Sequence, residues 1–177
     1  MPTKKTGYLL GIGSNIEPFN NFARIISLLL KCFEKISISR VLNIPPVGMN
    51  SHRYFLNAVV FIETELQKSE LKAICNQIEI ALGRDRNDPD RKLKDRQADL
   101  DILARLTFPD DAVRSASSIT NEYFLYPIID EIKAYLSQQS CLPMQRGSLI
   151  QVGKLSFGET ATTIYRDGNT GEKRIGQ

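Results

Sequence analysis

The chain has 177 residues and a mass of 20.0 kDa, a length that fits one domain with a sizeable core. Its 42% hydrophobic and 24% charged residues are near the averages for globular proteins, and no apolar run approaches the ~20 residues of a membrane-spanning helix. These values exclude a disordered chain and a membrane span, and a net charge of +3 is too small to indicate nucleic-acid binding by itself.

The first predicted elements are a strand and a helix. Residues 8–12 form an apolar run that predicts a buried strand, and the turn-forming Gly-Ser-Asn at residues 13–15 closes it. Apolar residues then recur every three or four positions over residues 20–33, which predicts an amphipathic helix. Asn20 or Asn21 can cap its start.

Two strands and a second helix follow. Residues 36–42 alternate in polarity and predict a strand with one face in contact with water, whereas residues 55–64 are nearly all apolar and predict a strand buried on both faces. The pattern over residues 69–82 predicts a helix that Ser69 caps. Gly83 stands where a left-handed residue is expected to end it.

The second half of the chain is less regular. Residues 108–121 are polar, and we expect a short strand over residues 123–126 and a helix opened by Pro over residues 127–136. Two short alternating runs within residues 149–164 predict a hairpin around Phe-Gly-Glu at residues 157–159. The glycine-rich tail after them is expected to fray.

The order of these elements predicts a single domain over residues 1–177. No internal repeat, low-complexity tract or linker divides the chain. Strands and helices alternate over most of its length, which favours one α/β sandwich with helices on both sides of a mixed sheet.

Cysteine use favours a reducing environment. Cys32, Cys75 and Cys141 are odd in number, widely spaced and form no Cys-x-x-Cys pair. Cys32 and Cys75 fall on apolar stripes of predicted helices, so we expect buried thiols. The apolar run after the basic start is too short for a signal-peptide core. We therefore expect a cytoplasmic protein.

The strongest chemical signal is a pair of aspartates that follows a charged loop. Six basic and four acidic residues crowd the loop over residues 84–96. Asp99 and Asp101 then share one face of a predicted strand, while Leu100 and Ile102 occupy the other. Two carboxylates about 6 Å apart repel by roughly 3 kcal/mol at an effective dielectric of about 20, and a divalent cation would reverse this cost. The pair therefore suits Mg²⁺ with a nucleotide, although a solvated acidic edge strand has the same pattern.

Arginines and a polar helix flank lie beside this pair. Arg84, Arg86 and Arg96 can fork onto phosphate oxygens and stabilise charge on a polyphosphate. Asn76 and Glu79 are three residues apart on the flank of the preceding helix. Each could contact a nucleotide, although polar residues at such positions are usually only solvated. No Walker A sequence is present, so a P-loop would not hold the nucleotide.

A third set of residues predicts recognition of a flat heterocycle. Phe55 and Asn57 share a strand face, which places a stacking aromatic ring beside an amide that donates and accepts hydrogen bonds. Pro-Pro-Val-Gly at residues 45–48 could form one wall. An asparagine satisfied by neighbouring backbone is an equally good interpretation of Asn57.

In this order, the motifs resemble those of the 6-hydroxymethyl-7,8-dihydropterin pyrophosphokinase (HPPK) family, over residues 8–136. They are Gly-Ser-Asn at 13–15, Pro-Pro-Val-Gly at 45–48, Phe-Leu-Asn-Ala at 55–58, Ile-Glu at 78–79 before Gly-Arg-x-Arg at 83–86, Arg-x-x-Asp-Leu-Asp-Ile-Leu at 96–103, and Phe-Leu-Tyr-Pro-Ile at 124–128. Residues 149–177 have no counterpart in this pattern. The resemblance implies an α+β fold, a three-layer α/β/α sandwich with a ferredoxin-like, mainly antiparallel sheet.

The resemblance also implies an ATP-dependent reaction of folate biosynthesis, in which pyrophosphate passes from ATP to the pterin and AMP is released. The small-molecule partners would be ATP and the pterin, with two Mg²⁺ ions held by Asp99 and Asp101. The implied catalytic residues are Arg84, Arg96, Asp99 and Asp101. The implied nucleotide contacts are Asn76, Glu79, Arg86 and Ile102. The implied pterin contacts are Pro45, Pro46, Val47, Phe55, Asn57 and Tyr123.

The chain also departs from the family pattern. Family members usually carry an aromatic residue and Gly-Pro just before the arginine that is Arg96 here, whereas this chain has Leu-Lys-Asp at residues 93–95. An arginine expected just before the second stacking aromatic is replaced by Asn-Glu at residues 121–122. One alternative is therefore a divergent domain that binds a pterin, a nucleotide or a protein partner with little or no catalysis. A nucleic-acid-binding module is disfavoured by the acids in the loop, and the oligomeric state is left open.

Overall fold

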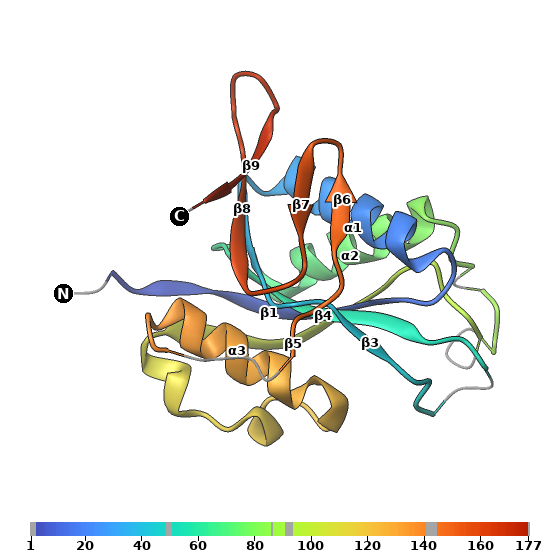
Figure 1. Ribbon diagram of the computed structural model, residues 1–177, viewed down its shortest axis with the longest axis horizontal. Helices are drawn as coiled ribbons and strands as arrows, with labels where there is room; N and C mark the ends of the chain where they lie inside the picture. Colours follow the sequence, from blue (N-terminus) through green and yellow to red (C-terminus); the bar gives the residue numbers. More distant parts are fainter. Residues whose placement is uncertain (1–2, 49–50, 86, 91–93, 141–144, 177) are drawn as a thin grey trace.

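The computed structural model describes residues 3–48, 51–85, 87–90, 94–140 and 145–176. They form three layers, a central sheet between two layers of helices (Figure 1). The strands are β1 (Lys5–Ser14), β2 (Lys35–Ile38), β3 (Leu42–Ile44), β4 (Phe55–Glu63), β5 (Asp99–Phe108), β6 (Ile150–Val152), β7 (Leu155–Phe157), β8 (Thr162–Arg166) and β9 (Lys173–Gly176). The helices are α1 (Pro18–Cys32), α2 (Lys68–Ala81) and α3 (Tyr126–Leu136), with short 3-10 turns at Asp110–Val113, Ala116–Ser118 and Tyr123–Leu125.

The central sheet runs in the order β5-β1-β4-β2-β8-β9, with β3 paired to β4 beside β2. Every strand pairing in the described part of the chain is antiparallel. Helices α1 and α2 cover one face and α3 covers the other (Figure 1). The predicted α+β sandwich with a mainly antiparallel sheet is therefore confirmed, whereas the mixed sheet expected from the alternation of elements is not found among the described pairings.

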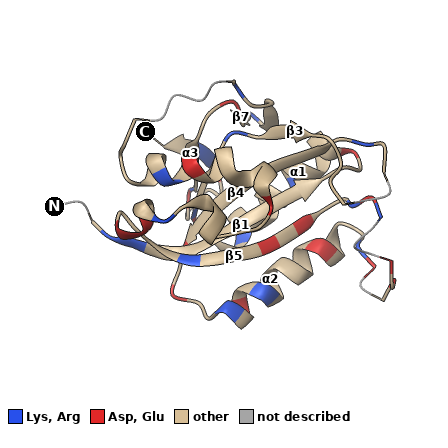
Figure 2. Cartoon of the chain, turned by 90° about the horizontal axis from the view of Figure 1, so that it is seen from below, with Lys and Arg blue, Asp and Glu red and all other residues tan. Residues whose placement is uncertain are grey.

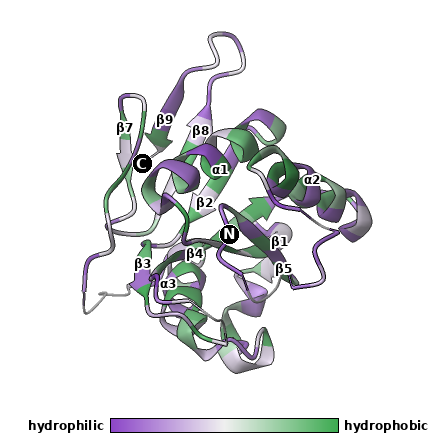
Figure 3. Ribbon diagram, turned by 90° about the vertical axis from the view of Figure 1, so that its right-hand side faces the viewer, coloured by the Kyte–Doolittle hydropathy of each residue, from purple (hydrophilic) through white to green (hydrophobic). Residues whose placement is uncertain are grey.

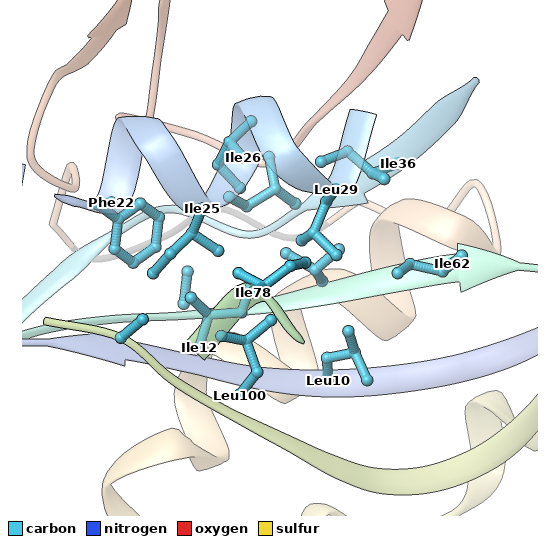
Figure 4. Close-up of a cluster of buried hydrophobic side chains, with 14 of the residues drawn as sticks. Leu10, Ile12, Phe22, Ile25, Ile26, Leu29, Ile36, Ile62, Ile78 and Leu100 are labelled. Atoms are coloured by element: carbon cyan, nitrogen blue, oxygen red, sulfur yellow. The ribbon is translucent and has the colours of Figure 1, made fainter. Parts of the chain in front are cut away.

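The two faces of the sheet carry two separate hydrophobic clusters. Along β1, Leu10 and Ile12 point toward α1 and α2, whereas Leu9 packs with α3. Phe22 of α1 and Leu100 of β5 are fully buried in the first cluster (Figure 4). Each such side chain stabilises the fold by about 1.5–3 kcal/mol on burial.

The start of the chain differs from the sequence-based expectation in two places. Strand β1 continues to Ser14, because Gly13 pairs with both neighbouring strands and forms no turn there. Helix α1 begins at Pro18 and has no side-chain cap, so the predicted asparagine cap is wrong. The side chain of Asn21 instead donates to the Ile16 carbonyl at 2.6 Å.

The strand predicted over residues 36–42 is two short strands, and its expected wet face is buried. Its polar groups find partners on the neighbouring strand β8 and on helix α3. The Ser37 and Thr163 hydroxyls are 3.0 Å apart, and the Arg40 guanidinium pairs with the Glu131 carboxylate at 3.1 Å. These polar groups are buried because they pair with one another inside the protein. The alternation of polar and apolar residues along the strand does not reveal such distant partners.

Helix α2 has the predicted extent but a different cap. Gln67 forms a capping box with Glu70, so Ser69 is not the cap. Gly83 has a φ of +103°, which confirms the expected left-handed end.

The cysteines divide into one exposed and one buried thiol. Cys32 is exposed at the last position of α1, so its predicted burial is wrong. Cys75 is fully buried, and burial raises the pKa of its thiol to about 12. Cys141 lies outside the described residues.

The last third of the chain shows the largest corrections. Residues 123–126 are not a strand, because a 3-10 turn at Tyr123–Leu125 leads directly into α3. The hairpin turns at Gly153 rather than at residues 157–159, and it packs beside α1. The tail adds β8 and β9 to the central sheet, and the projecting end of this β8–β9 hairpin is largely hydrophilic (Figure 3).

Among the described residues, no helix has the length and apolar character needed to cross a membrane.

Candidate functional site

A pocket opens on the α3 side of the sheet, where β1, β4 and β5 lie side by side. Residues that are distant in sequence meet there because the three strands are neighbours. The lining residues are Gly11, Ile12, Gly13, Ile44, Pro45, Val47, Gly48, Phe55, Asn57, Arg96, Asp99, Asp101, Glu122, Phe124 and Leu125.

The strand register aligns the two halves of this pocket. Gly13 of β1 pairs with Asn57 on one side and with Asp99 on the other, so the three residues form one row across the sheet. A Cβ atom at Gly13 would lie 3.1 Å from the Asn57 side-chain oxygen and 3.4 Å from the Phe55 ring. The absence of a side chain at Gly13 therefore keeps the floor open between the amide and the carboxylate.

Asp99 and Asp101 both line the pocket, and Leu100 between them is fully buried on the opposite face. This confirms the predicted alternation. Burial, followed by the negative charge of Asp99, raises the pKa of Asp101 above its ordinary value of 3.8. Partial burial and the closeness of the two carboxyl groups thus disfavour the charged form of Asp101.

Two arginines each contact a different carboxylate oxygen of Asp99. The Arg84 guanidinium lies 3.1 Å from one Asp99 oxygen, and the Arg96 guanidinium lies 2.6 Å from the other. Both arginine side chains are at most 14% exposed, so these are partly desolvated ion pairs. Arg84 lies three residues beyond the end of α2, and Asp99 is the first residue of the edge strand β5. Figure 2 shows acidic positions along the neighbouring β5 and α2.

Of the two nucleotide contacts predicted on the flank of α2, Glu79 is buried and Asn76 is half-buried. Glu79 is only 2% exposed, and one carboxylate oxygen accepts hydrogen bonds from the Leu100 amide at 3.0 Å and from Arg84 at 2.7 Å. These bonds join α2 to the edge of β5. Asn76 is half-buried, and its side-chain oxygen accepts no hydrogen bond from the described residues. Ile102 packs against the core below the sheet.

The predicted heterocycle pocket is assembled in part. Pro45, Val47 and Asn57 line it together with Phe55, which is 8% exposed. Pro46 belongs to the same wall segment but is not among the lining residues.

Tyr123, the last of the predicted pterin contacts, is not among the residues that line the pocket. Its side chain is 65% exposed and meets Phe124 edge-to-face, with ring centroids 6.0 Å apart. Phe124 lines the pocket in its place. The cause is the 3-10 turn, which directs successive side chains differently from the strand that the sequence predicted.

Other residues of the site were not predicted. Glu122 and Phe124 line the pocket, and Gly11 contributes the floor beside Asp101. Partial burial and then the charges of Asp101 and Asp99 raise the pKa of Glu122. The sequence signal for Phe124 was its place in the Phe-Leu-Tyr-Pro motif, and Glu122 lies two residues before that motif. Arg86, the third predicted arginine, lies outside the described residues.

Three carboxyl groups line the pocket, those of Asp99, Asp101 and Glu122. Among the residues that the structure describes, no three histidine, cysteine or acidic side chains converge to hold a metal ion. The Asp99 and Asp101 pair nevertheless has the oxygen chemistry that Mg²⁺ prefers, because Mg²⁺ commonly takes few protein carboxylates and completes its shell with water and phosphate.

These features define a class. An antiparallel α+β sandwich that gathers paired carboxylates, partly buried arginines and an aromatic-amide pocket at one end of its sheet is suited to phosphoryl-type transfer onto a small heterocyclic substrate. Residues 9–131 match the family model described as 7,8-dihydro-6-hydroxymethylpterin-pyrophosphokinase (HPPK). The chain belongs to this HPPK family.

Curated relatives agree with the family match. The chain is 31% identical over 102 residues to a 2-amino-4-hydroxy-6-hydroxymethyldihydropteridine pyrophosphokinase of Porphyromonas gingivalis, a match that covers 56% of this chain and 69% of the relative. It is 36% identical over 97 residues to the protein of the same name from Bacillus subtilis, covering 53% of this chain and 56% of the relative. A Methylorubrum extorquens relative with this name is 45% identical over 60 residues, or 34% of this chain and 36% of the relative.

Proposed function

We propose that this protein is an ATP-dependent pyrophosphokinase that transfers pyrophosphate from ATP to 6-hydroxymethyl-7,8-dihydropterin and releases AMP, a step of folate biosynthesis. One observation carries the proposal: in a chain of the HPPK family, the same pocket is lined by Asp99, Asp101, Arg96, Asn57 and Phe55. A charge-binding side and a heterocycle-binding side thus face one another.

The pterin would occupy the side formed by β4 and the loop before it. The Asn57 amide can donate to a ring oxygen or nitrogen and accept from a ring N–H group. Phe55 and Phe124 offer aromatic surface, and Pro45 and Val47 form the apolar wall. Tyr123 remains a predicted pterin contact, because its exposed ring lies beside Phe124.

The triphosphate would occupy the side formed by β5 and α2. Asp99 and Asp101 would hold Mg²⁺, because both carboxyl groups line the pocket from the same face of β5. When bound, Mg²⁺ supplies charge neutralisation to the phosphates. Arg84 and Arg96 add fixed guanidinium groups, and Asn76 has a side-chain oxygen available for the nucleotide.

The reaction needs alignment more than a strong base. The pterin hydroxyl oxygen forms a bond to the β-phosphorus while the bond from that phosphorus to the bridging oxygen of AMP breaks, and the hydroxyl proton is released. A pocket that holds the two substrates in line reduces the entropic part of this barrier. The chain supplies this through rigid strands beneath both substrate positions.

The test mixes the protein with MgATP and 6-hydroxymethyl-7,8-dihydropterin and follows the nucleotide product. AMP is expected only when the pterin is present. Asp99→Ala and Asp101→Ala are each expected to lower AMP formation by about a hundredfold or more, because each removes a charge ligand for the transferring group. Asp110→Ala, which removes an exposed pair with Lys4, is the matched control and is expected to retain activity. ADP as the product would contradict the assignment.

A second candidate is a pterin- or nucleotide-binding domain with little turnover. The observation that favours it is Glu122, whose carboxyl group adds a third negative charge to the pocket of Asp99 and Asp101. Calorimetric binding of the nucleotide and pterin without AMP formation would support this candidate over the first. In either case we propose a cytoplasmic setting, supported by the free thiol of buried Cys75.

A further inference from the structure

We propose that Asn15 is a positioning residue, which clamps the end of the charged loop so that Arg96 reaches the pocket. This inference rests on the proposed function, because it concerns the arginine that lines the substrate pocket. Asn15 follows the last residue of β1 and is only 2% exposed. It does not line the pocket itself.

The clamp consists of contacts from one asparagine to two consecutive loop residues. The Asn15 side-chain amide donates to an Asp95 carboxylate oxygen at 2.8 Å, and its side-chain oxygen accepts from the Arg96 backbone amide at 2.6 Å. The Asn15 backbone amide donates to the Arg96 carbonyl at 2.9 Å. The loop is thereby fixed to the end of β1 on both sides of the Arg96 Cα atom.

This attachment determines where the Arg96 side chain can reach. The guanidinium lies 2.6 Å from Asp99, three residues further along the chain, and Asp99 in turn pairs in register with Gly13 of β1. Both residues of the Arg96–Asp99 ion pair are therefore held by hydrogen bonds or strand pairing to β1 or to the residue that follows it. A loop that ended elsewhere would place the arginine away from the pocket.

The chemistry requires an amide at residue 15. A carboxamide donates with its nitrogen and accepts with its oxygen, which matches an acidic side chain on one side and a backbone N–H on the other. An aspartate at this position would instead place its carboxylate against that of Asp95. Alanine would leave the Arg96 amide without its acceptor. Asp95 also approaches Arg53, two residues before β4, at 3.5 Å. This pair is largely exposed, so it contributes little to stability by itself.

The experiment exchanges the side chains of Asn15 and Asp95. Asn15→Asp is compared with the double variant Asn15→Asp/Asp95→Asn, in which the new amide at residue 95 donates to the new carboxylate at residue 15. The hydrogen bond between residues 15 and 95 is thereby restored with its direction reversed, while the Arg96 backbone amide still donates to the side chain of residue 15. Measurements are made at pH 8, where an aspartate at residue 15 is ionised. The first readout is hydrogen exchange of the Arg96 backbone amide in the ligand-free protein by NMR, and the second is kcat and KM for AMP formation.

In Asn15→Asp we expect Arg96 amide exchange to rise and kcat to fall, each by about tenfold, with the pterin KM changed less than about threefold. The double variant should return both values to within about threefold of the original protein. Asn15→Ala should show the same losses, and Asp95→Asn should not rescue it. Glu131→Gln, a buried substitution remote from the pocket, controls for stability and should leave Arg96 exchange unchanged when measured under native conditions.

Unchanged Arg96 exchange in both single variants would overturn the clamp, as would a double variant no better than Asn15→Asp. The exchange readout needs no turnover. If the original protein forms no AMP while the exchange pattern appears as expected, the proposed function fails and the clamp stands. If AMP forms normally and Arg96 exchange does not respond, the clamp fails and the function stands.

Discussion

Gly13 controls how closely the two substrate sides of the pocket can approach. A Cβ atom there would lie 3.1 Å from the Asn57 side-chain oxygen, a distance that forces the amide to shift. At Gly11, two residues earlier on the same face, the nearest atom would be a Leu125 methyl group at 3.5 Å, an ordinary contact. The two positions therefore form a matched pair.

We predict that Gly13→Ala raises the KM for the pterin by about tenfold, because the Asn57 amide is displaced from its recognition position. Gly11→Ala should change this KM less than about threefold. Steady-state kinetics with the pterin varied at saturating MgATP gives the comparison. Equal effects at the two glycines would show that contact with Asn57 is not the cause.

The carboxyl group of Asp101 gives a prediction for stability against pH. Its pKa is raised in the folded protein, so between the ordinary value of 3.8 and the folded value the folded state binds more protons than the unfolded state. Stability from this group is therefore present at low pH and is lost as the pH rises through that window. Asp101→Asn should be more stable than the original protein at pH 7, with the difference shrinking toward pH 4.

Urea unfolding at several pH values measures this difference. Exposed Asp110→Asn is the control and should show no comparable pH-dependent gain. The burial argument predicts that the stability gained by Asp101→Asn over the original protein is larger at pH 7 than at pH 4. A smaller gain at pH 7 than at pH 4 would refute it.

Among the secondary-structure elements, the C-terminal strands belong to the main fold. Strand β8 pairs with β2 of the central sheet, and Ile164 is fully buried in the cluster under α1. Strand β9 lies at the sheet edge, where Ile175 is 41% exposed. The same residue type on paired strands thus occupies opposite environments, directly across the ladder.

Ile164→Ala is expected to lower the free energy of unfolding by about 2–5 kcal/mol, because it leaves a cavity in the core. Ile175→Ala should cost less than about 0.5–1 kcal/mol at its exposed edge position. Chemical denaturation of both variants tests whether residues after 149 are integral to the domain. A small and equal cost at both positions would indicate that they are not.

Across the molecule as a whole, a buried ion pair joins the sheet to the α3 layer. Arg40 follows β2, Glu131 lies in α3, and their side chains are 9% and 4% exposed. Glu131 also accepts a hydrogen bond from the Arg40 backbone amide at 2.7 Å. Removing one partner would leave the other buried without its charge partner.

We predict that Glu131→Gln lowers the free energy of unfolding by about 3 kcal/mol while AMP formation by the folded fraction is retained, because the pair lies outside the pocket. Replacing both partners, as in Arg40→Met/Glu131→Leu, should recover part of this loss. Thermal and urea unfolding give the stabilities. A double variant less stable than Glu131→Gln would contradict the desolvation argument.

Much of this architecture could be predicted from local pattern. The buried strand at β4, the amphipathic faces of α1 to α3 and the left-handed Gly83 were predictable because each depends on near neighbours in the chain. The wet face of β2 and the fraying tail were wrong for a shared reason. Ser37 and strand β8 acquire partners more than a hundred residues away, and no local pattern encodes them. Strand β9 then pairs with β8, so the order of the tail depends on the same distant pairing.

The candidate site shows the same division between local and distant information. Local alternation along a strand is enough to place Asp99 and Asp101 on one face, and the ordered motifs are enough to identify the family. What surrounds the two carboxylates depends on tertiary pairing: β1 aligns Asp99 with Gly13 and Asn57, and Arg84 reaches round an edge strand. Strand order and edge position arise from long-range pairing, so they exist only once the chain has folded.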